Sequence, residues 1–311
     1  IPESICDIYS NLNYFDLSNN YFCPPYPECI ESIGNQDTSN CENCESVSIS
    51  GDAIWLHQDY WTVHLSQLNS VAEQLESKNI ETIYFHIGDV DLQGNLNNNI
   101  TDYQSSVISD FVDLANTMDI GVLGTIGGQD ETFDFSSTTF QNNIINLCND
   151  LLSPTYCFNG IQFDLEPIPD INFDPVRYNS FLNLLSTVRS GIEYDQSNYI
   201  SIAVNRLHIN FEDWSYGQGD DWNWTIESYT TLAPLVDQMV VMVYYQCEDL
   251  DNLPSNFDYP FYLETTTSLL TQSINTNSIQ LNIGVPSYLD NIPPYGCYNT
   301  SHSLENGICG I

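Results

Sequence analysis

The chain reads Asn159-Gly160-Ile161-Gln162-Phe163-Asp164-Leu165-Glu166 near its middle, and this stretch predicts a buried strand that ends in two carboxylates. Side chains alternate between the two faces of a strand. One face would carry the apolar residues of the stretch, and the other would carry Gln162, Asp164 and Glu166. An apolar face covered by helices and a polar face turned inward are typical of a strand in a closed barrel.

The spacing of the two acids indicates chemistry. Asp164 and Glu166 would lie side by side on one face, where each disfavours ionisation of the other. One of them would then stay protonated near neutral pH, as general acid catalysis requires. The alternative is a buried polar pair held by hydrogen bonds, but burying two acids without a use is costly. We expect the two carboxylates to converge within hydrogen-bonding reach of each other or of Tyr244.

Strand and helix patterns alternate on both sides of this stretch. The expected strands cover residues 53–57, 82–87, 120–126, 159–166, 199–204, 239–245 and 279–285. Alternation of this kind predicts an α/β fold with a parallel sheet, here a (β/α)8 TIM-type barrel over residues 47–311, with the active site at the carboxyl ends of the strands. An eighth strand is not evident, so the C-terminal tail, the N-terminal segment or a neighbouring subunit must cover the gap, the last by self-assembly.

The acidic strand resembles the fourth strand of family 18 glycoside hydrolases, the chitinase family, whose pattern is Asp-Gly-x-Asp-x-Asp-x-Glu. Asp164 and Glu166 match its last two acids, and Asn159 and Gln162 stand in place of the first two. Three more segments resemble the family in the same order. Thr125-Ile126-Gly127-Gly128 is similar to its Ser-x-Gly-Gly, Met242-Val243-Tyr244-Tyr245 to its Met-x-Tyr-Asp, and Ile283-Gly284-Val285-Pro286-Ser287-Tyr288 to its Gly-x-Pro-x-Tyr.

The resemblance implies a reaction and its residues. Glu166 would protonate the leaving sugar oxygen, and Asp164 would orient the N-acetyl group of the substrate, which acts as the nucleophile. Tyr244 would contact that N-acetyl group. The implied substrates are chitin-like polymers of β-linked N-acetylglucosamine, hydrolysed with retention and with no metal or organic cofactor.

Aromatic and polar residues are candidates for holding the sugar. Aromatic faces stack on sugar rings, and a long loop after the fifth expected strand is rich in them. The expected substrate-binding residues are Gln162, Tyr245, Trp55, Trp214, Trp222 and Tyr288. The aromatic loop, which also holds Trp224, could instead form a local core. His57 and His86 lie on expected strands, and each could line the pocket or serve a core or hydrogen-bonding role.

Charge excludes whole classes of partner. Lys plus Arg number 4 against 42 Asp plus Glu, for a formal net charge of −38. Nucleic acid is excluded, because phosphate binding needs clustered basic residues. An anionic membrane surface is disfavoured for the same reason, and no apolar run is long enough for membrane insertion. The acidity indicates solubility in a salty or calcium-rich medium, or cations bound along the surface.

Cysteine usage predicts a secreted, disulfide-bonded glycoprotein. Five of the ten cysteines precede residue 45, so residues 1–46 are expected to form a small stapled cap with one cysteine free or bonded elsewhere. Cys148 and Cys157 are a plausible local pair. Cys41-x-x-Cys44 favours disulfides over zinc, since no second pair follows. Glycosylation sequons lie at Asn99, Asn223 and Asn299, and Ile1-Pro2 is expected to open a processed mature form.

A second class of function stays open. The barrel could be a catalytically silent lectin, or a storage or extracellular structural protein. Asn159, Gln162 and Tyr245, together with the missing terminal tryptophan of the family, favour this reading. The intact pair of Asp164 and Glu166 favours an enzyme.

Overall fold

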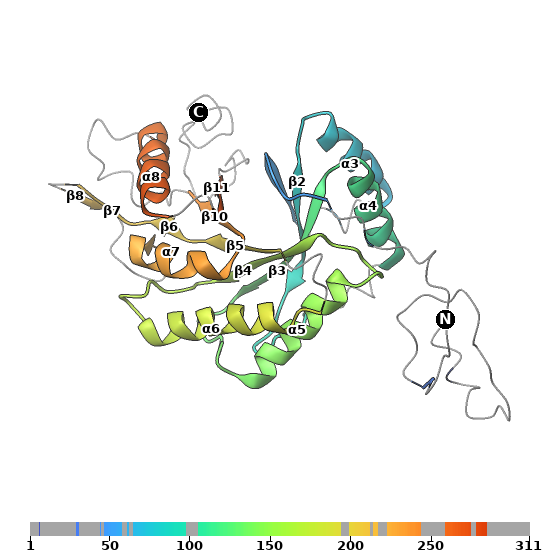
Figure 1. Cartoon of the computed structure of the whole chain (residues 1–311), viewed down its shortest axis with the longest axis horizontal. Coiled ribbons are helices and arrows are strands. Elements are labelled where there is room, and N and C mark those ends of the chain that lie inside the picture. Colours follow the sequence, from blue (N-terminus) through green and yellow to red (C-terminus); the bar gives the residue numbers. More distant parts are fainter. Residues whose placement is uncertain are drawn as a thin grey trace, which may run out of the picture.

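The computed structural model describes residues 6, 29–30, 44, 47–57, 61, 65–97, 105–193, 199–211, 214–216, 223–243, 259–274 and 278–284. Parallel strands form one curved sheet, and helices cover its outer face (Figure 1). The expected α/β TIM-type fold is confirmed, as a seven-stranded partial barrel within the described residues. Most of the expected cap lies outside these residues.

The main sheet contains every strand that the sequence predicts. Its order is β1-β2-β3-β4-β5-β10-β11, and each neighbouring pair is parallel. The bounds are β1 Ala53–Leu56, β2 Thr82–Asp89, β3 Gly121–Gln129, β4 Gly160–Glu166, β5 Ile200–Val204, β10 Gln238–Met242 and β11 Gln280–Gly284. Two small additional sheets pair β6 Arg206–Leu207 with β9 Asn223–Trp224, and β7 Ile209–Phe211 with β8 Trp214–Tyr216.

Helices connect the strands as crossovers. They are η2 Leu65–Gln67, α3 Leu68–Glu76, α4 Ser105–Thr117, α5 Thr138–Leu152, α6 Pro175–Gly191, α7 Ile226–Leu232, η5 Ala233–Leu235 and α8 Tyr259–Ser273. Ser137 caps α5 and Asp174 caps α6, each accepting a hydrogen bond from a backbone N–H of the first turn. Among the described helices, none is both long enough and apolar enough to cross a lipid bilayer.

The main core lies between the sheet and the helices. The outward face of β4, formed by Ile161, Phe163 and Leu165, has no exposed surface and packs in this core. Leu151 of α5 and Phe181 of α6 belong to the same core. The predicted alternation of β4 is therefore confirmed, and it leaves the even-numbered side chains facing inward.

A row of polar residues crosses the inside of the barrel at one level. Its members are His86, Thr125, Gln162, Ser201, Gln238 and Gln280, aligned in register from β2 to β11. The Ser201 hydroxyl donates to Gln238 Oε1 at 2.6 Å, and the Tyr84 hydroxyl donates to the same oxygen at 3.0 Å. Hydrogen bonds connect Thr125, Gln162, Ser201 and Gln238 of this row, and such a connected network fixes side-chain positions away from water. This row lies one layer below the two acids of β4, and we call it the floor of the site.

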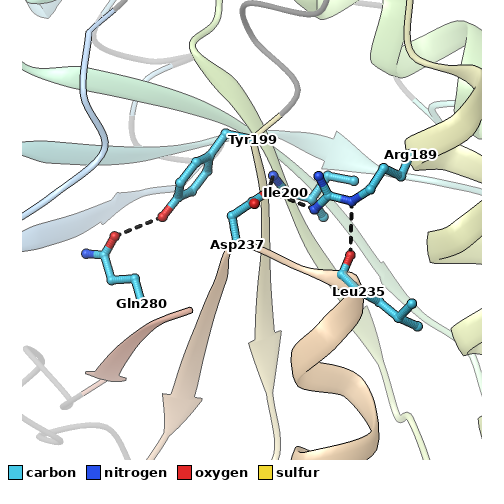
Figure 2. A network of polar contacts seen from close by, with 6 residues as sticks. All are labelled: Arg189, Tyr199, Ile200, Leu235, Asp237 and Gln280. Carbon is cyan, nitrogen blue, oxygen red and sulfur yellow. Dashed lines mark hydrogen bonds and ion pairs between the residues drawn. The ribbon is translucent and has the colours of Figure 1, made fainter. Parts of the chain in front are cut away.

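Hydrogen bonds and an ion pair tie the opposite, amino-terminal end of the sheet (Figure 2). Arg189 of α6 forms an ion pair with Asp237 at 2.7 Å and donates to the Leu235 carbonyl at 3.2 Å. The same Asp237 oxygen accepts from the backbone N–H of Ile200 at 2.8 Å. One carboxylate thus joins α6 to the starts of β5 and β10.

The edges of the sheet, β1 and β11, approach each other inside the barrel. A Cβ added to Gly284 would lie 3.0 Å from Cη2 of Trp55, so the indole reaches across to the last strand. Asn282 of β11 also donates to the Tyr84 hydroxyl of β2 at 3.2 Å. Side chains therefore bridge the gap from within. The expected contribution of the C-terminal tail lies outside the described residues.

The described residues form two disulfides, and one of them corrects the expected pairing. Cys6 bonds to Cys29, and Cys44 bonds to Cys157. The predicted Cys148–Cys157 pair is wrong: Cys148 is a free, buried thiol on the inner side of α5. Closeness in sequence misled the prediction, since the partner of Cys157 comes from the N-terminal segment. The expectation that a cap cysteine reaches the barrel is confirmed by Cys44.

Candidate active site

The two acids lie at the carboxyl end of β4, on the inner face. Asp164 is aligned with Gly127 of β3, and Glu166 is aligned with Gln129 of the same strand. Active sites of this fold are built at this end of the strands. Sequence therefore placed the pair correctly along the strand and on the correct face.

Asp164 is held in a site that lacks a partner for one of its oxygens. Its Oδ1 is buried, and no hydrogen-bond donor reaches it from the described residues. Burial raises the pKa of Asp164 to about 6, against the lowering effect of His86 and with a further rise from Asp89. A buried carboxylate oxygen without a hydrogen-bond partner is suited to accept a hydrogen bond from an N–H group of a ligand.

Glu166 is set to hold a proton at neutral pH. Burial and the neighbouring charge of Asp164 raise the pKa of Glu166 to about 7, and a hydrogen bond from Gln129 lowers it. Gln129 donates through Nε2 to Glu166 Oε2 at 3.3 Å. The Glu166 carbonyl accepts from the Asp130 backbone N–H at 3.0 Å, which ties β4 to the loop after β3.

The expected hydrogen bond between the acids is not observed within the described residues. Asp164 and Glu166 are linked instead by charge, since Asp164 raises the pKa of Glu166. Two ionised carboxylates are acceptors only, so a direct bond needs a shared proton. The second expected partner, Tyr244, lies outside the described residues.

Gln162 lies one layer below the acids and is fully buried. Its Oε1 accepts from Trp55 Nε1 at 2.9 Å and from the Thr125 hydroxyl at 3.1 Å, and its Nε2 donates to Ser201 Oγ at 3.2 Å. The protein uses both ends of this amide. These contacts place Gln162 in the floor of the site, and its expected contact with a sugar stays a prediction.

A histidine and an aspartate of β2 complete the inner rim. His86 Nε2 lies 3.3 Å from Asp89 Oδ1, and the ring of His86 stacks on His57 with centroids 4.6 Å apart. Both groups lie over Gly127, because a Cβ added there would be 2.4 Å from each of those two atoms. Asp89 is aligned with Gly127, which is in turn aligned with Asp164.

A bulge in β2 brings this pair together, and sequence reasoning missed it. Residues three apart on a regular strand face opposite sides. The register shifts between His86 and Gly88, and Gly88 has φ 149°, so Asp89 turns to the same face as His86. His86 was considered for the pocket, but Asp89 was not. The glycine at the end of an apolar strand was the available signal.

The remaining predicted site residues are placed only in part. Trp55 is half-buried, and its indole N–H is bonded to Gln162. Trp214 pairs with Phe211 across β7 and β8, and Asn223 is aligned with Arg206. For these strands the structure describes the backbone position of Trp214 and Asn223 and not their side chains. Outside the described residues lie Tyr244, Tyr245, Trp222, Tyr288, Asn99 and Asn299.

One tryptophan of the aromatic loop belongs to the core. Trp224 is fully buried between Tyr178 and Tyr229, with ring centroids at 5.6 and 5.4 Å, and its N–H donates to the Ile168 carbonyl at 2.7 Å. For this residue the local core is confirmed. The loop is thereby fixed to the segment that follows the acids of β4.

Comparison with known proteins identifies the fold. No family model and no curated protein matches the sequence. A chitinase from Chromobacterium violaceum has 13% identity and a TM-score of 0.50, over 76% of this chain and 68% of that one. The chain has a chitinase fold. A chitinase from Bacteroides thetaiotaomicron has 16% identity and a TM-score of 0.52, over 75% and 66% of the two chains.

A third solved structure carries a ligand. A double mutant of a family 18 chitinase from Cycas revoluta, in complex with (GlcNAc)4, has 15% identity and a TM-score of 0.50, over 76% of this chain and 68% of that one. Identities this low show a shared fold and nothing finer. The chitinase-like fold expected from the sequence motifs is thus confirmed.

The chemistry that this arrangement can support follows from the charges. Two carboxyl groups with raised pKa values stand at the end of β4, and the charge of one raises the pKa of the other, which suits one group to donate a proton and the other to hold a negative charge. Among the described residues, no group of three His, Cys, Asp or Glu side chains is arranged to hold a metal ion.

Proposed function

We propose that the protein is a secreted glycoside hydrolase that acts on polymers of β-linked N-acetylglucosamine. The observation that carries this proposal is the position of the two acids at the carboxyl end of β4, where one buried oxygen of Asp164 has no hydrogen-bond donor among the described residues. Burial raises the pKa of both carboxyl groups, and the charge of an ionised Asp164 raises that of Glu166 further, so the pair is suited to hold one proton on Glu166 beside an ionised Asp164. A substrate-assisted reaction needs these two states together.

In the proposed reaction, Glu166 gives its proton to the glycosidic oxygen as the bond from that oxygen to C1 of the sugar breaks. The carbonyl oxygen of the substrate's N-acetyl group attacks C1 and forms a cyclic, positively charged intermediate. Asp164 accepts a hydrogen bond from the N–H of that group through its unpartnered oxygen and balances the charge. Water then attacks C1, the bond from C1 to the acetyl oxygen breaks and restores the N-acetyl group, and Glu166 takes the proton of the water, which returns the enzyme to its starting state. Tyr244 is proposed as a further contact to the N-acetyl group.

Sugar contacts beyond these two acids are part of the proposal. Trp55, Trp214, Trp222, Tyr245 and Tyr288 are proposed to bind further sugar units by stacking. Asn99, Asn223 and Asn299 are proposed glycosylation sites. The disulfides Cys6–Cys29 and Cys44–Cys157 support an oxidising, extracellular setting.

Replacing the acid tests the reaction. Glu166→Gln keeps the size of the side chain and its contact with Gln129 but removes the proton donor. We expect kcat on a chitooligosaccharide to fall about 10²- to 10⁴-fold, the usual share of a general acid, while binding is largely kept. The matched control is Glu131→Gln, an exposed glutamate in the loop after β3. Equal activity of Glu166→Gln and wild type would exclude this acid.

A catalytically silent, sugar-binding barrel is the second candidate, and Gln162 favours it. Where an acid could share a proton with Asp164, the structure has a neutral amide bonded to three protein groups. Calorimetric binding of (GlcNAc)4 by a wild-type protein that does not cleave it would establish this alternative and refute the enzyme.

A further inference from the structure

We propose that His86, held by Asp89, is a positioning residue for Asp164 that supplies the charge balance Gln162 cannot provide. The inference rests on the proposed function for its catalytic consequence. Its electrostatic part concerns only these side chains.

Geometry places His86 next to the carboxylate. Its Nε2 lies above the Cα of Gly127, the residue aligned with Asp164 on the neighbouring strand. Gly127 carries no side chain, so nothing from β3 separates the imidazole of β2 from the carboxylate of β4. The residue one layer below Asp164, Gln162, faces Trp55, Thr125 and Ser201 and leaves no free polar atom.

The ring itself is fixed on several sides. Asp89 contacts Nε2 at 3.3 Å and His57 stacks on one face with ring centroids 4.6 Å apart, while the hydrogen bond that Trp61 donates to the His86 carbonyl at 2.8 Å holds the backbone. From β3, Gly127 and Thr125 face the ring, and neither is ionisable. Among the described ionisable groups, Asp89 and His57 contact the ring, and Asp164 interacts with it through charge.

The charges act on Asp164 in opposite directions. His86 favours the ionised form of that carboxylate, and Asp89 disfavours it, as the causes of its raised pKa show. Asp89 also holds the imidazole, and its own pKa is lowered, chiefly by the hydrogen bond to His86. An imidazole held over Gly127 by Asp89 is therefore placed to favour the ionised form of Asp164.

The decisive experiment titrates Asp164 directly. The ¹³Cγ signal of Asp164, assigned by its loss in Asp164→Asn, is followed against pH in wild type, His86→Gln and His57→Gln. We expect the midpoint to move to higher pH in His86→Gln, because the imidazole that favours the ionised carboxylate is lost. His57→Gln is the matched control, since it removes a histidine from the same stack one strand further away, and its midpoint should stay in place. Should His86→Gln not fold, His86→Asn is measured instead.

Kinetics test the catalytic consequence. In His86→Gln the acid limb of the pH profile of kcat should move to higher pH, together with the titration midpoint of Asp164. At pH 6 kcat should fall roughly 10- to 100-fold, the usual cost of removing a residue that orients a functional group, with a smaller change in KM.

The outcomes separate this inference from the proposed function. An unmoved midpoint in His86→Gln, or an equal movement in His57→Gln, overturns the inference whatever the activity. Another outcome is a midpoint that moves in His86→Gln while the wild type hydrolyses no chitooligosaccharide. That result refutes the proposed function and leaves the charge link between His86 and Asp164 established. A moved midpoint with an unmoved acid limb in an active enzyme overturns the positioning role.

Discussion

At the scale of single residues, the protonation of the site depends on two carboxyl groups that lie close together and away from water. Burial is the first cause of the raised pKa of both Asp164 and Glu166. The folded protein therefore holds protons that the unfolded chain would release at the same pH, and these acids oppose folding as the pH rises.

This effect predicts a pH-dependent gain of stability in Glu166→Gln. The pKa of Glu166 rises from 4.5 to about 7 on folding, so its contribution is fully present below pH 4.5 and is lost as the pH rises through 7. Wild type should lose on the order of 2 kcal/mol more stability than Glu166→Gln between pH 4 and pH 8. Urea unfolding at both pH values measures the difference, with Glu264→Gln on the exposed side of α8 as control. Parallel pH curves for Glu166→Gln and wild type would contradict the raised pKa.

Sequence alone could locate these acids but not their surroundings. The period of two on β4 fixed the face of Asp164 and Glu166. It did not reveal Asp89, because a bulge at Gly88 turns that residue to the inner face, and a glycine is a weak signal of a bulge when it is read alone. Gln129 was missed for a related reason: its contact with Glu166 depends on the register between β3 and β4, which one strand does not encode.

At the scale of elements, the segment after β4 is held by one buried carboxylate. Asp170 Oδ2 accepts from the Thr225 backbone N–H at 2.6 Å, from its hydroxyl at 2.8 Å and from the Ser228 hydroxyl at 2.9 Å. These donors belong to the start of α7. Burial alone would raise the pKa of Asp170, but its hydrogen bonds with Thr225, Asn172 and Ser228 lower it overall.

Asp170→Asn should therefore destabilise the protein at neutral pH more than in acid. A lowered pKa gives stability that is fully present above the ordinary value of 3.8 and is lost as the pH falls through the folded pKa. We expect a loss of about 2 kcal/mol at pH 7, as for hydrogen bonds to a charged group, and a smaller loss near pH 3. Denaturant unfolding measures both. Asp134→Asn, an exposed aspartate that binds its own turn, is the control and should cost little. A loss that does not depend on pH would contradict the role of the charge.

Strands were more predictable than the loops that join them. Each strand of the main sheet contains a short run of apolar residues, so its position could be predicted from the sequence of that segment alone. The aromatic loop could not be resolved in this way, because burial of Trp224 depends on Tyr178 of α6, which is 46 positions away in the sequence. A tryptophan suited to a sugar platform is equally suited to a core until its neighbours are known.

At the scale of the whole molecule, Cys44–Cys157 joins the N-terminal segment to the loop before β4. The bond spans 113 positions, whereas Cys6–Cys29 spans 23. A longer closed loop restricts the unfolded chain more. Pairing over such a distance cannot be read from spacing, which is why Cys148 was wrongly preferred as the partner of Cys157.

Removing the two disulfides should have unequal effects. The Cys44→Ser/Cys157→Ser double variant should lose about 4–5 kcal/mol of unfolding free energy, and the matched Cys6→Ser/Cys29→Ser variant about 3 kcal/mol. Guanidinium unfolding under oxidising conditions measures both. An equal or smaller loss for the longer loop would show that residual structure in the unfolded chain outweighs loop length.

The same long bond gives the polypeptide the form of a ring with two tails. Residues 44–157, which include β1, β2 and β3, form the ring. The strand β4 and all later elements belong to the C-terminal tail. Lys78, the one lysine of the chain, is exposed in the turn after α3 and lies on the ring. A protease that cuts after lysine therefore opens the ring without releasing a fragment, and the nicked molecule stays in one piece until a reductant is added.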